Sequence, residues 1–144
     1  MRLGSPAFDD DGLIPSRFTC DGEDVSPPLH IDELPTGTVT LVLTMDDPDA
    51  PAGTWDHWVA YDIEPLAEIP EAVASLGVAG TNSWGRTGYG GPCPPRGTHR
   101  YRFSVYALDT ALDWDPGADK AGVLGAIHGH VLDEATLVGY YARG

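Results

Sequence analysis

The sequence carries little positive charge. Lysine and arginine together number 8, against 22 aspartates and glutamates, and the formal net charge is −14. Such a charge repels nucleic acids and anionic membrane surfaces, which excludes both as bulk partners. Lys120 is the only lysine, and an acidic surface poor in lysine fits either a salt-loving organism or a GC-rich genome. Both explanations stay open on the sequence.

Cysteine is also scarce, and long apolar runs are missing. Cys20 and Cys93 do not make a disulfide framework, and we expect both to be free thiols in a reducing cytosol unless the fold brings them together. No apolar run approaches the roughly 18 residues that a membrane helix requires. Residues 1–6 lead into no apolar core of a secretory signal. The expected location is therefore the cytoplasm, without integral membrane contact.

Turn-forming residues are what the sequence has in abundance. A chain of 144 residues suits one domain, residues 1–144, and its 13 prolines and 18 glycines favour short strands over long helices. The clearest strand is Thr38–Met45, which is rich in β-branched and apolar residues. His57–Ile63 and His99–Leu108 alternate with the period of a strand. Shorter strands are expected near residues 13–18, 29–31 and 136–141, and a helical turn near residues 71–76.

Only residues 118–132 show the apolar period of a helix. Residues 47–53 must form a loop, because Pro48 and Pro51 restrict themselves and the residues before them. Residues 80–97 form a second loop, rich in glycine and proline and long enough to carry function. Several strands and one late helix predict a mainly β fold, a two-sheet antiparallel β-sandwich with one late α-helix.

Three stretches, taken in order, resemble the phosphatidylethanolamine-binding protein family, in its bacterial and archaeal Raf-kinase-inhibitor-like branch. They are Phe18-Thr19-Cys20-Asp21-Gly22 with Ser26-Pro27-Pro28-Leu29, then Asp47-Pro48-Asp49-Ala50-Pro51 with Trp55-Asp56-His57-Trp58, and Gly90-Gly91-Pro92-Cys93-Pro94-Pro95-Arg96-Gly97 with His99-Arg100-Tyr101. A weaker fourth match is Gly129-His130-Val131-Leu132 with Leu137-Val138-Gly139-Tyr140. The ordered set spans nearly the whole chain.

The resemblance implies two antiparallel sheets and one anion pocket. Members of the family bind phosphate, carboxylates or phosphorylated headgroups, and relatives dock on kinases or proteases. The chain departs from the mammalian pattern because Asp56 stands where a second histidine would precede His57, and because it ends soon after Tyr140. The implied ligand-binding residues are Asp47, Asp49, Pro51, Trp55, His57, Cys93, Pro94, Pro95, His99 and Tyr101, with no catalytic residue, metal or cofactor.

The chemistry of these residues suits an anion. His57, His99 and Tyr101 offer N–H and O–H donors, and we hypothesise that Asp47 orients one histidine from the side away from the ligand. The plainer interpretations are that Asp47 and Asp49 stabilise a turn and that His57 and Tyr101 fill the core. Arg86 and Arg96 are interpreted as exposed loop charges that could reach an anion, and Ala50-Pro51 is a candidate cis bond.

Three other functions are compatible with the sequence. Asp47, His57 and His99 could form the two-histidine, one-carboxylate site of a metal-dependent enzyme. Cys93 with His99 could form a hydrolase pair, although flanking prolines leave the thiol no helix N-terminus to lower its pKa. The chain could also act as an inhibitor that docks on a kinase or protease, with an unidentified protein target, and an open sheet edge is compatible with a homodimer.

Overall fold

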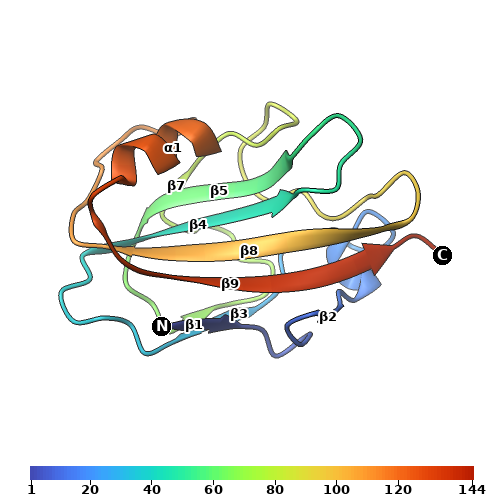
Figure 1. Ribbon diagram of the computed structural model, residues 1–144, viewed down its shortest axis with the longest axis horizontal. Coiled ribbons are helices and arrows are strands. Elements are labelled where there is room, and N and C mark those ends of the chain that lie inside the picture. The colour runs from blue at the N-terminus through green and yellow to red at the C-terminus, as the bar shows by residue number, and fades with distance from the viewer.

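The four longest strands of the chain lie side by side in one sheet. The computed structural model describes residues 1–144 and places β4 (Thr40–Asp47), β5 (Trp55–Ile63), β8 (Thr98–Leu108) and β9 (Val131–Ala142) in the order β9-β8-β4-β5 (Figure 1). The short strands β2 (Gly12–Leu13) and β7 (Val78–Ala79) extend this sheet at its two edges. All pairings are antiparallel except the short pair of β2 with β9.

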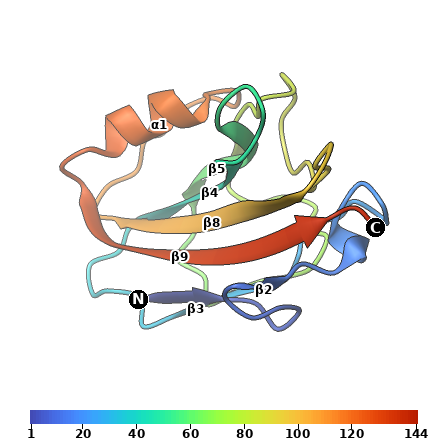
Figure 2. The same ribbon diagram turned by 45° about the vertical axis from the view of Figure 1, so that its right-hand side comes forward.

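A second, smaller sheet covers one face of the large one. It consists of β1 (Arg2–Gly4), β3 (Leu29–Asp32) and β6 (Glu68–Ile69) in the order β1-β3-β6. Figure 2 shows β1 and β3 beneath the large sheet, with α1 (Lys120–Ile127) on the opposite side. This arrangement confirms the predicted mainly β sandwich of two sheets with one late helix.

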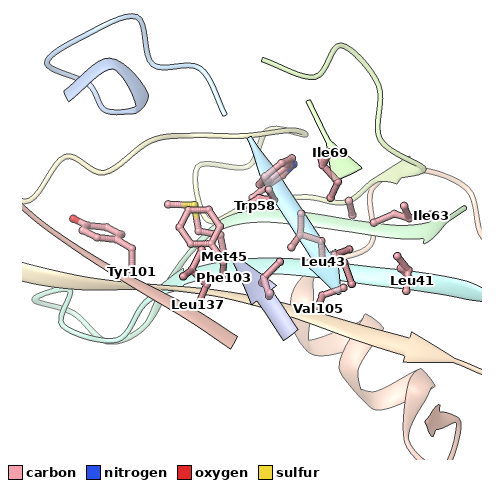
Figure 3. Close-up of a cluster of buried hydrophobic side chains, with 14 of the residues drawn as sticks. Leu41, Leu43, Met45, Trp58, Ile63, Ile69, Tyr101, Phe103, Val105 and Leu137 are labelled. Carbon is pink, nitrogen blue, oxygen red and sulfur yellow. The ribbon is translucent and has the colours of Figure 1, made fainter. Parts of the chain in front are cut away.

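Apolar side chains fill the space between the sheets. In β8 the alternation of the sequence becomes alternation of burial, since Tyr101, Phe103 and Val105 are fully buried while Arg102 and Ser104 are half-exposed. Figure 3 shows the core row that these side chains form with partners from neighbouring strands. A separate cluster under α1 buries the other face of β4 and β5. Two covered faces explain why Thr38–Met45 is an almost continuous apolar run.

The helix is shorter than its apolar period predicts. It spans Lys120–Ile127 rather than residues 118–132, and the Asp119 side chain caps its start by accepting the N–H of Gly122 at 2.8 Å. Residues from Val131 onward instead pair with β8 along its whole length, beginning opposite Leu108. The final strand is therefore twice as long as residues 136–141 would make it, because a strand partner outweighs weak helical propensity.

Smaller differences lie in the connections. The expected strand near residues 13–18 divides into β2 and a short 3-10 helix, η1 (Ser16–Phe18). Residues 71–76 contain a turn at residues 71–72 and a bend at residue 74 rather than a helical turn. The loop over residues 80–97 is present as expected, apart from one isolated bridge between Thr81 and Thr87. The single α-helix has 8 residues, too few to cross a membrane.

The two cysteines are joined, so the expectation of free thiols was wrong. Cys20 and Cys93 form a disulfide with their Cα atoms 5.4 Å apart. The backbone N–H of Cys20 donates to the carbonyl of Pro92 at 3.1 Å, so a backbone hydrogen bond also joins the segments that carry the two cysteines. At Gly91 a Cβ atom would lie 2.2 Å from the Asp24 carboxylate, so only glycine allows this approach. Disulfides are rare in reducing compartments, so this one does not support the predicted cytoplasmic location. That location stays a prediction.

Candidate functional site

A cavity opens at the end of the sandwich where β4 finishes and where β5 and β8 begin. The loops after β4 and before β8 both lie at this end, close to the segment around η1 (Figure 1). The hairpin register sets Asp47 opposite Trp55, and the β4–β8 register sets Asp46 opposite Arg102. The cavity has a volume of about 320 Å³ and is lined by Asp47, Ala50, Pro51, Trp55, His57, Trp84, Cys93, Pro94, Pro95 and His99.

Two histidines form the polar wall of this cavity. The Nδ1 atom of His57 lies 2.7 Å from the carbonyl oxygen of Gly90, and Nδ1 of His99 lies 2.7 Å from a carboxylate oxygen of Asp47. Since both acceptors lack a proton, both histidines carry theirs on Nδ1. The Nε2 atoms have no hydrogen-bond partner in the protein. A neutral imidazole in this tautomer accepts at Nε2, and only the protonated ring donates there.

Burial lowers the pKa of His57. Its side chain is 4% exposed, and desolvation lowers its pKa from the ordinary value of 6.5 against the opposing influence of Gly90 and Asp47. The free protein therefore holds His57 in the neutral state at neutral pH. A negative charge near Nε2 would act against this lowering, because an opposite charge favours the imidazolium.

Two buried donors at the site have no partner at all. They are the hydroxyl of Tyr101 and the indole N–H of Trp55. The Tyr101 ring lies 5.3 Å from the ring of His57 and 6.4 Å from that of His99, centroid to centroid. Figure 3 shows Tyr101 at one end of the core row. Burial, reinforced by the charges of Asp47 and Asp49, raises its pKa, so the hydroxyl keeps its proton.

Asp47 combines the two roles that the sequence left open. One carboxylate oxygen accepts the backbone N–H of Asp49 at 2.8 Å, which is a turn-stabilising bond. The other accepts the Nδ1–H of His99, on the side of the ring away from Nε2. Asp47 therefore fixes both the loop and the orientation of His99, as the hypothesis of an orienting carboxylate required.

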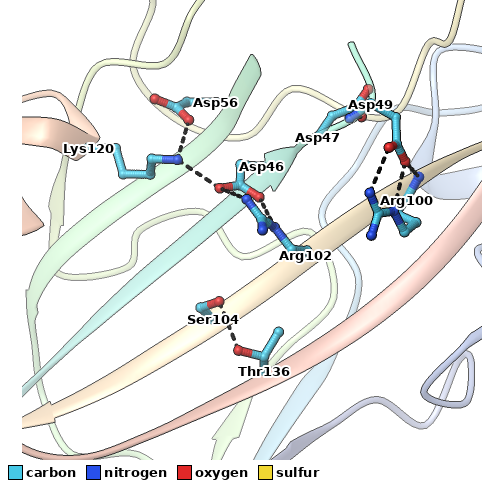
Figure 4. Close-up of polar contacts among 9 residues, drawn as sticks. All are labelled: Asp46, Asp47, Asp49, Asp56, Arg100, Arg102, Ser104, Lys120 and Thr136. Carbon is cyan, nitrogen blue, oxygen red and sulfur yellow. Dashed lines mark hydrogen bonds and ion pairs between the residues drawn. The ribbon is translucent and has the colours of Figure 1, made fainter. Parts of the chain in front are cut away.

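Asp49 is placed differently from the other predicted ligand-binding residues. It does not line the cavity, and its carboxylate accepts three bonds of 2.8 to 3.0 Å from the backbone and guanidinium of Arg100 (Figure 4). The bonds from Arg100 lower the pKa of Asp49 to about 2. Tyr101 also lies outside the lining, with its ring beside both imidazoles. The peptide bond before Pro51 is trans, so the expected cis bond was wrong.

A second network lies beside the cavity, on the outer face of the large sheet. Lys120 of α1 reaches Asp46 at 2.7 Å and Asp56 at 2.8 Å, and Arg102 binds the same Asp46 carboxylate at 2.7 Å (Figure 4). Burial alone would raise the pKa of Asp46, but the bonds from Arg102 and Lys120 outweigh it and the pKa is lowered. Asp46 and Asp56, which directly precede Asp47 and His57, are therefore both paired with basic side chains.

Trp84 belongs to the site, although it was not among the predicted ligand-binding residues. Its ring stands edge-on to the rings of His57 and Trp55, with centroid distances of 4.9 and 5.5 Å. These three rings together line one part of the cavity. An aromatic residue in a loop of glycine and proline was the available signal. The loop conformation, set by Asn82 accepting the N–H groups of Trp84 and Arg86, could not be derived from spacing.

The geometry argues against both enzyme alternatives. Asp47 bonds directly to His99, so the two do not act as separate ligands aimed with His57 at one metal ion, and no group of three metal-binding side chains is present. Cys93 is oxidised in the disulfide and offers no thiolate to attack a substrate.

Comparisons with known proteins agree with this architecture. The family described as phosphatidylethanolamine-binding protein matches residues 4–142. A UPF0098 protein of Methanothermobacter thermautotrophicus is 53% identical, covering 100% of both chains, and a UPF0098 protein of Chlamydia muridarum is 40% identical, covering 99% of both.

Two solved structures are similar over almost the whole chain. A putative phosphatidylethanolamine-binding protein homologue of Chlamydia trachomatis is 38% identical with a TM-score of 0.97, over 99% of this chain and 97% of that one. An Escherichia coli protein described as a new member of the mammalian family is 27% identical with a TM-score of 0.91, over 99% of this chain and 98% of the other.

Proposed function

This chain belongs to the phosphatidylethanolamine-binding protein family, and on that premise we propose that it binds a small anion, a phosphate or carboxylate group, in the cavity lined by His57 and His99. The observation that carries the proposal is a set of unused polar atoms around one cavity. The Tyr101 hydroxyl and the Trp55 indole N–H are buried without partners, and both histidines leave Nε2 unbonded.

Unpartnered buried donors need an explanation. Leaving one such group unsatisfied costs roughly 1–3 kcal/mol, and native proteins keep few of them. Trp55 lines the cavity and the Tyr101 ring lies beside both imidazoles, which can become cations, so this set of groups suits a ligand that accepts hydrogen bonds and carries negative charge. The carboxylate that lines the cavity, Asp47, is engaged with His99 and with the N–H of Asp49, so it does not oppose the anion as a free charge.

The size of the cavity limits the ligand. A volume of about 320 Å³ lies at the lower end of the range for small-molecule sites. Such a space accepts a phosphate group with a short substituent. Binding rather than turnover is proposed, because Cys93 is held in the disulfide and Asp47 is held by His99. Docking on a kinase or protease stays an expectation from the family resemblance.

Calorimetric titration with inorganic phosphate and with acetate tests the proposal. We expect saturable binding at one site, and we expect His99→Ala to weaken it by tenfold or more. His128→Ala is the matched control, since His128 is exposed beyond the end of α1 and should leave the affinity unchanged. Absence of binding by the unmodified protein, or equal losses in the two variants, would contradict the proposal.

A further inference from the structure

Two of the eight basic side chains in this acidic protein have no carboxylate partner, and both lie on the loop that walls the cavity. The N-terminal amine and six basic side chains form ion pairs: Arg2, Arg17, Arg100, Arg102, Lys120 and Arg143. Arg86 and Arg96 form none. With almost three acids for every base, an unpaired arginine is the exception, so the location of both on this one loop requires a reason.

The chain holds both arginines on stiffened segments. Arg86 ends a tight turn in which its own N–H and that of Trp84 donate to the Asn82 side chain, at 3.2 and 3.0 Å. The Arg86 guanidinium then lies over the Trp84 ring, 5.7 Å from its centroid. Arg96 directly follows Pro95, which lines the cavity. Prolines and the disulfide at Cys93 restrict that segment as well.

The acids near this end are occupied elsewhere. Asp49 is bound by Arg100, Asp56 by Lys120, and Asp21 by Arg143 and the Tyr141 hydroxyl. Asp24 accepts the backbone N–H of Gly91 at 2.8 Å. The positive charges of Arg86 and Arg96 are therefore left for a partner outside the chain, although the protein as a whole is strongly negative.

We infer that the ligand carries a second anionic group beyond the one in the cavity, and that Arg86 and Arg96 bind this second group. The inference rests on the proposed anion site. The ligand class is a short phosphate ester or dicarboxylate with negative charge at both ends, rather than a zwitterion with an ammonium group. An ammonium at the rim would meet two uncompensated guanidinium groups, and one of them already covers the Trp84 ring that could otherwise attract a cation.

Two ligands of similar size separate these classes. Phosphoglycolate ends in a carboxylate and phosphorylethanolamine ends in an ammonium, while inorganic phosphate has no second group. Calorimetric titrations at fixed ionic strength should give affinities in the order phosphoglycolate, then inorganic phosphate, then phosphorylethanolamine. We expect Arg86→Gln and Arg96→Gln each to weaken phosphoglycolate binding about three- to tenfold and to change inorganic phosphate binding by less than twofold. Arg2→Gln, the same charge change far from the cavity, should affect neither ligand.

The outcomes distinguish the two proposals. If inorganic phosphate and acetate do not bind, the anion site itself is refuted and this inference falls with it. If inorganic phosphate binds but phosphorylethanolamine binds as tightly as phosphoglycolate, the anion site stands and the second-group inference is refuted. The second-group inference is also refuted if the arginine variants weaken phosphoglycolate binding no more than Arg2→Gln does.

Discussion

A carboxylate oxygen of Asp47 and Nδ1 of His99 lie 2.7 Å apart, in a pair that is almost fully buried. The bond joins the end of β4 to the start of β8 and leaves Nε2 of His99, a residue that lines the cavity, without a partner in the protein. It also places the negative charge of Asp47 beside the His99 ring, where it would stabilise the ring in its protonated form. Ligand affinity should therefore depend on Asp47, although Asp47 need not touch the ligand.

The first prediction concerns that charge. Asp47→Asn should keep the fold and weaken sulfate or phosphate binding about tenfold, because a hydrogen bond to a charged group contributes roughly 1 to 1.5 kcal/mol more than a neutral one. Calorimetric titration at several values between pH 5 and 8 measures the effect. Asp49→Asn is the matched control, with the same charge change in the same loop outside the cavity lining. Equal affinities for Asp47→Asn and the unmodified protein across this range would refute the orienting role.

The second prediction concerns pH. The folded-state pKa of His57 lies below its ordinary value of 6.5, so the unfolded chain binds more protons than the native state in that range. The contribution of His57 to stability is therefore present above pH 6.5 and is lost as the pH falls below it. Denaturant titrations of the protein without ligand should show this acid-side loss. His57→Asn, which retains an N–H near the Gly90 carbonyl but does not titrate, should lose less.

The affinity for an anion should also depend on pH. Because Nε2 of His57 donates only from the protonated ring, an anion raises the pKa of His57 and binds more tightly as the pH falls from about 8 toward 5.5. Sulfate is the suitable probe, since its charge is constant over this range. Calorimetry in two buffers of different ionisation enthalpy would reveal proton uptake on binding. Sulfate affinity that is independent of pH, with no proton uptake, would exclude protonation of the imidazoles as the source of affinity.

The fourth prediction separates the effect of the Tyr101 hydroxyl on stability from its effect on binding. Tyr101→Phe removes a buried hydroxyl that has no partner, so the free protein should be equally stable or more stable by up to about 2 kcal/mol. The same change should weaken sulfate binding about five- to tenfold. Tyr61→Phe is the opposite case, because the Tyr61 hydroxyl donates to the Asp115 carbonyl and accepts the N–H of Ala118. That control should lose roughly 1–2 kcal/mol of stability. If Tyr101→Phe behaved like Tyr61→Phe and bound sulfate normally, Tyr101 would be structural only.

The spacing of apolar residues and the positions of turn-forming residues predicted most of the fold. β8 was visible as alternation and β4 as a continuous apolar run, because those patterns follow from which faces are covered. The start of β9 could not be predicted, since residues 131–135 owe their extended form to pairing with β8 rather than to their own propensity. A long-range pairing of this kind leaves no local pattern in the sequence.

The site was predictable in part. Motif resemblance brought together residues that line one cavity, among them Asp47, His57 and His99. It did not distinguish Asp49, whose neighbour Arg100 captures it, or Trp84, whose placement depends on the turn held by Asn82. These outcomes are decided by side-chain hydrogen bonds between segments, which residue types and spacing do not specify.

The last prediction concerns the disulfide between Cys20 and Cys93, which closes a loop of sequence separation 73. Cross-linking residues that far apart restricts the unfolded chain, so a reduced or Cys20→Ala/Cys93→Ala protein should lose roughly 4 kcal/mol of unfolding free energy. Denaturant titration with and without reductant measures the loss, and the double variant, which has no thiols, should not respond to reductant. Cys93 also lines the cavity, so reduction should weaken sulfate binding by releasing the segment that carries Pro94 and Pro95. Two thiols that react with an alkylating reagent in the native, unreduced protein would instead restore the free cysteines that the sequence led us to expect.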